Sequence, residues 1–181
     1  MNRVAIDIDE VLVNFLFPMA KYHMKTIHKP KYNYVYRQIF DIDEKTSQKM
    51  VQEFYRSKAF MELTPIRGSQ RAMFNLKKNS KKMYIVTGRQ DTVREETELW
   101  IEQYFPGIFD DVILTNSYTP HEVQKSDICR ALNIGLIIDD NKGICDQCIG
   151  AGTKALNFVG DEIYPWCEES EISIKGWDKI T

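Results

Sequence analysis

Four short apolar runs, each ending in polar or charged residues, constrain the fold of this chain more than any other feature. They are VAIDID at 4–9, MYIVTGR at 83–89, DVILTN at 111–116 and GLIIDDN at 135–141. A later run, TKALNFV at 153–159, is a candidate fifth strand. Continuous apolar runs of this length are typical of strands buried on both faces, as in a parallel sheet.

Segments with the apolar spacing of amphipathic helices lie between these runs, at 67–79, 89–105 and 122–133. Strands that alternate with helices predict an α/β fold, in which right-handed crossovers place helices on both faces of a parallel sheet. We therefore expect a Rossmann-like α/β core.

One interval, 15–66, breaks this alternation. It holds two helical segments, at 15–29 and 43–60, joined by a loop at 29–36, and it has no convincing strand. An interval of this length is too long for a plain crossover. We expect it to form a small helical cap, inserted after the first strand into a core made of residues 1–14 and 67–181.

The charge balance of the chain excludes some classes of partner. There are 24 basic and 26 acidic residues, for a net charge of −2, so no overall field favours nucleic acid or an anionic membrane. No apolar run approaches the roughly 18 residues of a membrane span, and the first ten residues lack the apolar stretch of a signal peptide. We expect a soluble, cytoplasmic protein, and the sequence leaves open whether it forms a homodimer.

The four cysteines, Cys129, Cys145, Cys148 and Cys167, include a CxxC pair. A zinc site normally requires a second pair of ligands at close spacing, and here only Cys167 follows. Cys145 and Cys148 lie three apart in an expected helix and so share one face. We expect reduced thiols that pack as small apolar groups, with a redox or zinc role as the less favoured alternative.

Charged and polar residues collect where the predicted strands end. In open parallel sheets, ligand sites lie at the carboxyl ends of the strands, so residues far apart in the chain are expected to meet there. They are Asp7, Asp9, Thr87, Gly88, Arg89, Asp139 and Asp140, with Lys125 at the start of the helix before the fourth strand.

The acids of this group need positive charge nearby. Asp7 and Asp9 are two apart and would face the same way in a regular strand, and Asp139 would arrive beside them if the first and fourth strands are neighbours. Carboxylates a few ångströms apart repel by several kcal/mol, unless one takes up a proton or a cation lies between them. Oxygen ligands next to a phosphate are typical of Mg²⁺, and Lys125 would offset the remaining charge.

In chain order, these residues are similar to the four motifs of the haloacid dehalogenase superfamily of phosphatases. The first motif is DIDEV at 7–11, the second is Thr87, the third is Lys125, and the fourth is the Asp139–Asp140 pair. The resemblance covers residues 1–15 and 67–160. The cap, the segment TGRQDTVREETELWIEQYFPG and the PW and GWD near the end most resemble the 5'(3')-deoxyribonucleotidase group.

The resemblance implies a Mg²⁺-dependent phosphatase with an aspartyl-phosphate intermediate, and it assigns a role to each matched residue. It implies that Asp7 attacks phosphorus and that Asp9 serves as general acid and then general base. Thr87 would bind a phosphoryl oxygen, and Lys125 would screen the nucleophile. Asp7, the backbone carbonyl of Asp9, and Asp139 would hold the metal, supported by Asp140.

Two residues depart from a simple match. Glu10 stands where many members of the superfamily carry glycine, and the residues offer no physical reason for it. Lys142 follows the acidic pair closely and is an alternative to Lys125 as the catalytic lysine.

The substrate is expected to be a small phosphorylated metabolite, and a nucleoside monophosphate is favoured. Ten of the 21 aromatic residues lie between Phe15 and Phe60, where they either stack on a base or fill the core of the cap. Phe15 and Phe17, which are nearest to the first motif, are candidate substrate contacts. Gly88 and Arg89 are candidates for the phosphate, and a solvated Arg89 is the alternative.

Other functions remain open at this point. The same fold could act on a sugar phosphate, a phosphoprotein or a nucleic-acid 3'-phosphate. A non-enzymatic receiver domain, which also uses an acid pair, a Thr and a Lys, is less favoured because Asp9 lies in phase with Asp7 and a cap follows.

Overall fold

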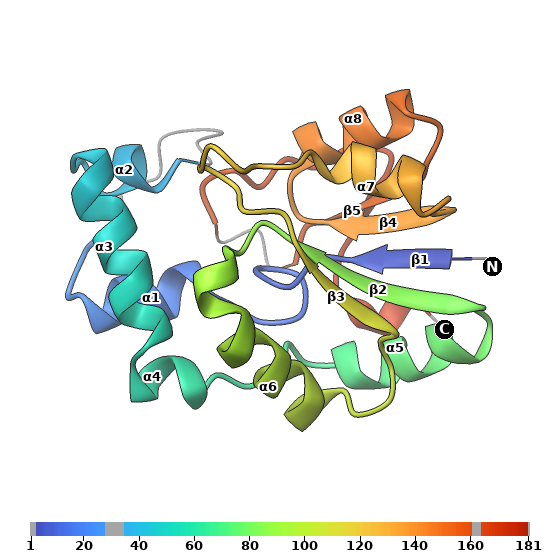
Figure 1. Ribbon diagram of the computed structural model, residues 1–181, viewed down its shortest axis with the longest axis horizontal. Helices are drawn as coiled ribbons and strands as arrows, with labels where there is room; N and C mark the ends of the chain where they lie inside the picture. The colour runs from blue at the N-terminus through green and yellow to red at the C-terminus, as the bar shows by residue number, and fades with distance from the viewer. Residues whose placement is uncertain (1–2, 28–34, 161–163, 181) are drawn as a thin grey trace.

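The computed structural model describes residues 3–27, 35–160 and 164–180, and its centre is a six-stranded parallel sheet. The strands are β1 (Arg3–Ile6), β2 (Lys82–Thr87), β3 (Asp111–Leu114), β4 (Leu136–Asp139), β5 (Lys154–Phe158) and β6 (Ser173–Ile174). Their order across the sheet is β3-β2-β1-β4-β5-β6 (Figure 1). The five predicted strands are confirmed. The sixth has only two residues, too few to leave a pattern in the sequence.

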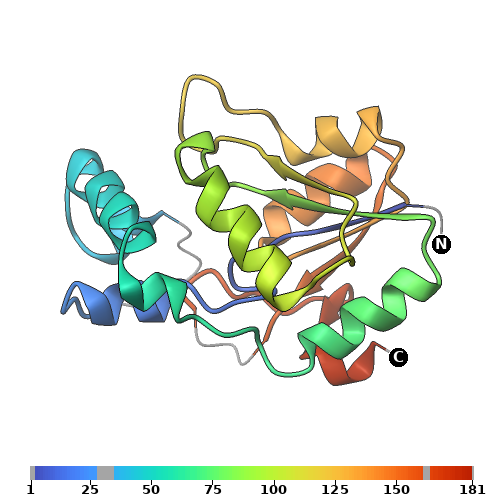
Figure 2. The same ribbon diagram turned by 60° about the horizontal axis from the view of Figure 1, so that its bottom comes forward.

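Both faces of the sheet are covered by helices (Figure 2). Val4 and Ile6 of β1 pack with α5 (Ser69–Lys78) and α6 (Arg94–Tyr104). Ala5, between them, packs with α7 (Lys125–Ala131) and α8 (Lys142–Gly150) on the opposite face. Because successive side chains of a strand point to opposite faces, such a strand accepts no polar residue until it ends. The predicted α/β fold is confirmed.

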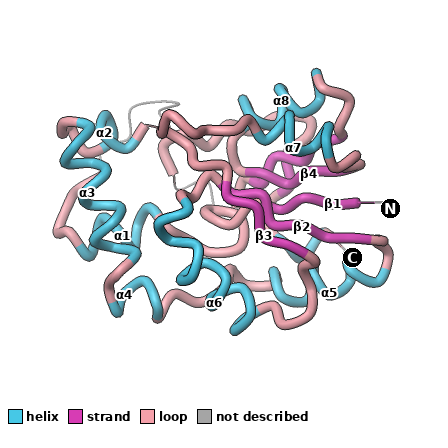
Figure 3. The backbone as a smooth tube through the Cα atoms, viewed as in Figure 1, coloured by secondary structure: helices cyan, strands magenta, loops and turns pink. Residues whose placement is uncertain are grey.

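The helices of the inserted segment lie beyond the carboxyl ends of the strands (Figures 1 and 3). They are α1 (Leu16–Tyr22), α2 (Tyr36–Ile39), α3 (Glu44–Tyr55) and α4 (Lys58–Met61). They enclose a separate aromatic core, in which the ring of Phe15 lies 5.2 Å from that of Phe54 and 5.1 Å from that of Tyr55. Val93 and Trp166, from outside the segment, also join this cluster, and the cap boundaries at 15 and 66 stay a prediction.

The cap helices are shorter than the sequence predicts. The segment 43–60 forms two helices, because Ser57 ends one and begins the next. Its hydroxyl donates to the carbonyl of Phe54 at 2.6 Å and accepts from the N–H of Phe60 at 3.1 Å. The helix predicted over 15–29 ends at Tyr22. Most of the loop predicted over 29–36 lies outside the described residues, and Tyr36 begins α2.

In the core, the helix predicted over 89–105 begins with a short 3₁₀ turn, Asp91–Val93, and α7 begins three residues later than expected. All four cysteines are free, and Cys129, Cys145 and Cys148 are buried between α7, α8 and the sheet, in agreement with their predicted packing role. None of the described helices is both long enough and apolar enough to cross a membrane.

Candidate active site

The first strand ends at Ile6, so the strand predicted over 4–9 is too long. The N–H of Asp7 still donates to the carbonyl of Ile138 at 3.0 Å, and the chain then turns. In this turn, the carbonyl of Ile8 accepts from the N–H groups of Val11, Leu12 and Val13. Asp7 and Asp9 both line one cavity. The turn, and not the alternation of a regular strand, therefore places Asp9.

Lys125 contacts two of the acids. Its Nζ lies 2.9 Å from Asp7 Oδ1 and 2.7 Å from Asp139 Oδ2, and all three side chains are buried. Because β4 lies beside β1 in the sheet, Asp7, which follows β1, lies near Asp139, which ends β4. Lys142 instead pairs with Asp146 on the outside of α8 at 2.7 Å. Of the two candidate lysines, Lys125 is the one that contacts the predicted nucleophile.

The acidic pair after β4 is divided between two environments. Asp139 is fully buried, and its carboxylate accepts from Lys125 and from the N–H of Asn141 at 2.9 Å. Asp140 lines the cavity, and it accepts from the indole N–H of Trp166 at 2.5 Å. The structure therefore places Asp140, rather than Asp139, in the wall of the cavity.

The carboxylate oxygens of Asp7, Asp139 and Asp140 lie within 4.8 Å of one another. Burial raises the pKa of Asp7 to about 6, although Lys125 opposes this and Asp139 adds to it. Burial, followed by the charges of Asp139 and Asp7, raises the pKa of Asp140. Such a cluster is short of positive charge. A set of hard oxygen donors of this kind fits Mg²⁺.

Thr87 ends β2 and Gly88 follows it, and both line the same cavity as Asp7 and Asp140. Thr87 is fully buried and lines the cavity, as does Gly88. A Cβ added at Gly88 would lie 2.9 Å from Ser117 Oγ, closer than real contacts allow. A larger residue at position 88 would therefore displace Ser117, where the end of β2 approaches the loop after β3. Thr87 and Gly88, which are both predicted site residues, thus line the same cavity as Asp7.

Arg89 is buried, and it forms an ion pair with Asp9, the other predicted catalytic acid. Its Nε and Nη2 donate to the two oxygens of Asp9, at 3.0 and 2.7 Å, while Nη1 donates to Thr97 Oγ1 at 3.1 Å. The rings of Tyr55 and Phe60, from the cap, lie 5.1 and 5.2 Å from the guanidinium. The alternative of a solvated Arg89 is wrong. The side chain joins Asp9, the core and the cap.

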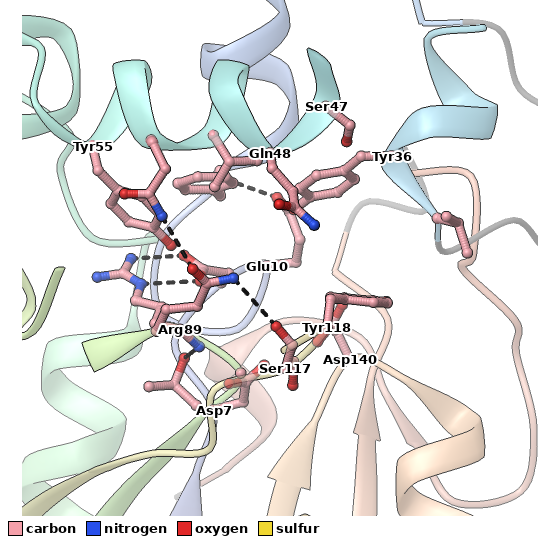
Figure 4. Close-up of a pocket in the computed structure, with 18 of the residues that line it drawn as sticks. Asp7, Glu10, Tyr36, Ser47, Gln48, Tyr55, Arg89, Ser117, Tyr118 and Asp140 are labelled. Atoms are coloured by element: carbon pink, nitrogen blue, oxygen red, sulfur yellow. Dashed lines mark hydrogen bonds and ion pairs between the residues drawn. The ribbon is translucent and has the colours of Figure 1, made fainter. Parts of the chain in front are cut away.

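The cap supplies the opposite wall of the cavity (Figure 4). Phe15, Tyr36 and Tyr55 of the cap contribute aromatic surface, and Trp166, from outside the inserted segment, adds to it. Phe17, the other predicted contact, packs against the aromatic core of the cap and is not among the residues lining the cavity.

Several lining residues are absent from the sequence predictions. The side of α3 that faces the cavity carries Glu44, Ser47, Gln48, Val51, Gln52 and Tyr55. Their spacing of three or four residues defines one helix face, so the pattern was available in the sequence. Trp166 lies 26 residues beyond its partner Asp140, and nothing in its surroundings in the sequence indicates that contact.

No family model matches the chain, and no curated protein matches it. Its structure is similar to a haloacid dehalogenase-like family hydrolase from Streptococcus pneumoniae, at a TM-score of 0.63 and 14% identity, over 86% of this chain and 83% of that one. A HAD family hydrolase from Deinococcus radiodurans R1, with bound phosphate and sodium, gives a TM-score of 0.63 at 13% identity, over 97% and 91%. A "putative beta-phosphoglucomutase" from Thermotoga maritima gives a TM-score of 0.60 at 16% identity, over 97% and 94%. The chain thus has the fold of the haloacid dehalogenase-like hydrolases.

Proposed function

We propose that this protein is a Mg²⁺-dependent phosphomonoester hydrolase that acts through an aspartyl-phosphate. The observation that carries the proposal is the buried contact of Lys125 with Asp7 and Asp139, next to a cavity that Asp7, Asp9 and Thr87 line. A lysine held there reduces the repulsion between a carboxylate nucleophile and a phosphate dianion.

In this proposal, a carboxylate oxygen of Asp7 forms a bond to phosphorus while the bond from phosphorus to the leaving oxygen breaks. Asp9 gives a proton to the leaving alkoxide. It then takes a proton from the water that cleaves the aspartyl-phosphate. Thr87 would bind a phosphoryl oxygen at the end of β2.

The proposed metal ligands are Asp7, the backbone carbonyl of Asp9, and Asp140. This assignment exchanges the roles of the acidic pair, because Asp139 is occupied by Lys125 and Asn141, whereas Asp140 lines the cavity. When bound, Mg²⁺ supplies positive charge to the phosphoryl oxygens. Asp139 would hold Lys125 against Asp7.

The favoured substrate is a nucleoside monophosphate. The aromatic walls from Phe15, Tyr36, Tyr55 and Trp166 suit a planar ring, and the amide of Gln48 lies on the same wall for polar contacts to the edge of that ring. A sugar phosphate is the second candidate, which the name of the Thermotoga maritima protein favours.

The test is phosphate release from a panel of nucleotides and sugar phosphates, with Mg²⁺ or with EDTA. Asp7→Asn should abolish turnover while the circular dichroism spectrum stays that of a folded protein. Turnover by Asp7→Asn at the wild-type rate would reject the mechanism. A protein that takes up phosphate once from an acyl phosphate, without multiple turnover, would be a receiver-like switch instead.

A further inference from the structure

Glu10 lies in the turn that follows Asp9, and its side chain reaches to the first helix of the cap. Its Oε1 accepts from the N–H of Phe15 at 2.8 Å and from the N–H of Leu16 at 2.7 Å. Glu10, Phe15 and Leu16 are all at most 2% exposed. The side chain is thus a direct link between the turn carrying Asp9 and the start of the cap.

Holding a glutamate in this position is costly. Its φ is 63°, in the left-handed region that glycine adopts freely and other residues seldom do. Its second oxygen, Oε2, is buried and has no hydrogen-bond partner in the described part of the chain. Leaving a buried polar atom unpaired is unfavourable, because its hydrogen bonds to water are lost and not replaced. Strain of this kind persists where the surrounding structure requires it, often at functional sites.

The link serves a helix that has no cap of its own. The first N–H groups of a helix have no partner within it, and no side chain at Phe15, the residue before α1, accepts from them. The carboxylate of Glu10 supplies that acceptor from the preceding turn.

Through Phe15, the link reaches the wall of the cavity. The ring of Phe15 lines the cavity and contacts the rings of Tyr36, Phe54 and Tyr55, at centroid distances of 6.4, 5.2 and 5.1 Å. When the N–H of Phe15 is held by Glu10, the ring and the aromatic side chains packed on it are held as well. Glu10, the residue next to Asp9, is therefore connected through Phe15 to the aromatic wall of the cavity.

We propose that Glu10 is a positioning residue, which fixes the aromatic wall of the cap relative to Asp7 and Asp9 and so determines how firmly the alcohol part of the substrate is held. The inference rests on the proposed phosphatase function. It gives a physical reason for glutamate at a position where the resemblance leads one to expect glycine, since glycine satisfies the backbone and supplies no link.

Three variants of Glu10 distinguish the effect of its hydrogen bonds to the cap from the effect of its left-handed φ. Glu10→Gln keeps an oxygen for the two N–H groups, Glu10→Ala removes it, and Glu10→Gly removes it and also relieves the left-handed φ. We expect KM for a nucleoside monophosphate to rise at least about tenfold in the Ala and Gly variants, equivalent to about 1.4 kcal/mol. Glu10→Gln should restore KM to near the wild-type value. If Glu10→Ala does not fold, Glu10→Gly carries the test.

Acetyl phosphate is the second substrate, because its acyl group is too small to use the aromatic wall. Its kcat/KM should change less than twofold in Glu10→Gly. Asp43→Ala is the matched control. It removes the acceptor for the N–H of Thr46 at the start of α3, at 2.9 Å, also in the cap but away from the catalytic turn. It should leave both KM values unchanged.

Amide hydrogen exchange tests the link without turnover. The amides of Phe15 and Leu16 should exchange at least about tenfold faster in Glu10→Gly than in the wild type or Glu10→Gln, while amides of α5 stay unchanged. An unchanged exchange rate, an unchanged KM for the nucleotide, or an equal loss on acetyl phosphate would each overturn the inference. Absence of turnover by the wild type on every phosphomonoester would reject the proposed function instead, and the exchange data would still decide whether Glu10 holds the cap.

Discussion

At the scale of single residues, Lys125 and Lys142 form a matched pair, because both begin helices and both contact acids, but only Lys125 is buried. Burial lowers the pKa of Lys125, yet Asp139 and Asp7 more than offset this and raise it overall. The ammonium group is therefore charged at any working pH.

Lys125→Met should abolish turnover and lower the free energy of unfolding by about 3–5 kcal/mol, since it leaves two buried carboxylates without their cation. Lys142→Met should change neither, because its partner lies on the surface. Urea unfolding followed by circular dichroism, together with phosphate release, measures both quantities. The reverse result would identify Lys142 as the functional lysine.

The raised pKa of Glu10 leads us to expect that the free energy of unfolding depends on pH. Burial raises its pKa from 4.5 to about 7, although the N–H groups of Leu16 and Phe15 oppose this. The folded protein therefore holds the proton more tightly than the unfolded chain, so this stabilisation is complete below pH 4.5 and is lost as the pH rises through 7. Relative to Glu10→Gln, the wild type should lose up to about 3 kcal/mol between these limits.

Urea unfolding of both proteins in EDTA, at intervals from pH 4.5 to 7.5, measures this difference. EDTA keeps divalent cations from altering the charge next to Glu10. Stability curves that run parallel over the whole range would show that Glu10 does not titrate differently in the folded state.

At the scale of elements, the close approach of the end of β2 to the loop after β3 predicts a specific clash. Gly88→Ala would place a Cβ 2.9 Å from Ser117 Oγ and 3.3 Å from Ser117 Cβ. Because the serine side chain can shift, we expect a cost of about 1 kcal/mol, at the low end for overpacking. We expect lower stability and, because both residues line the cavity, a lower kcat/KM. The double variant Gly88→Ala/Ser117→Gly should recover the lost stability, as thermal unfolding would measure. Equal losses in the single and double variants would exclude the clash as the cause.

The elements themselves could be predicted largely from local patterns. The apolar runs identified five strands, because a strand covered on both faces needs continuous apolar side chains. Helix ends were less predictable. The break between α3 and α4 depends on one hydroxyl, that of Ser57, which bonds both Phe54 and Phe60, and a serine leaves no such signal in hydrophobic periodicity.

At the scale of the whole molecule, the cap lies over the strand ends where Asp7, Asp139 and Asp140 come together (Figure 1). A cation that binds only this assembled cluster stabilises the folded state by mass action. When the free cation concentration is 100 times the dissociation constant, the free energy of unfolding rises by about 2.7 kcal/mol. Mg²⁺ should therefore raise the thermal midpoint of the wild type at constant ionic strength.

Asp140→Asn is the control for this effect, because it removes one of the proposed ligands and can keep the contact with Trp166. The variant should show a smaller response to Mg²⁺, measured by thermal unfolding against EDTA. An equal response in both proteins would indicate that the cation binds elsewhere.

The sequence by itself determined the α/β architecture, the inserted helical segment, and the set of residues collected at the strand ends. These conclusions depend on local patterns and on the rule that parallel strands present their carboxyl ends at one edge. The rule places Asp7, Thr87, Lys125 and the acidic pair near one another without any knowledge of side-chain contacts.

Only the tertiary structure decided which member of each set faces the cavity. Arg89 meets Asp9 across 80 residues of chain, Asp139 turns toward Lys125 and Asp140 toward the cavity, and Glu10 bonds to the start of the cap. Each outcome depends on the direction of a side chain at the end of a strand or just after it. There the direction is selected by the hydrogen bonds of the turns and by packing against segments distant in the sequence, and neither leaves a pattern in the local sequence.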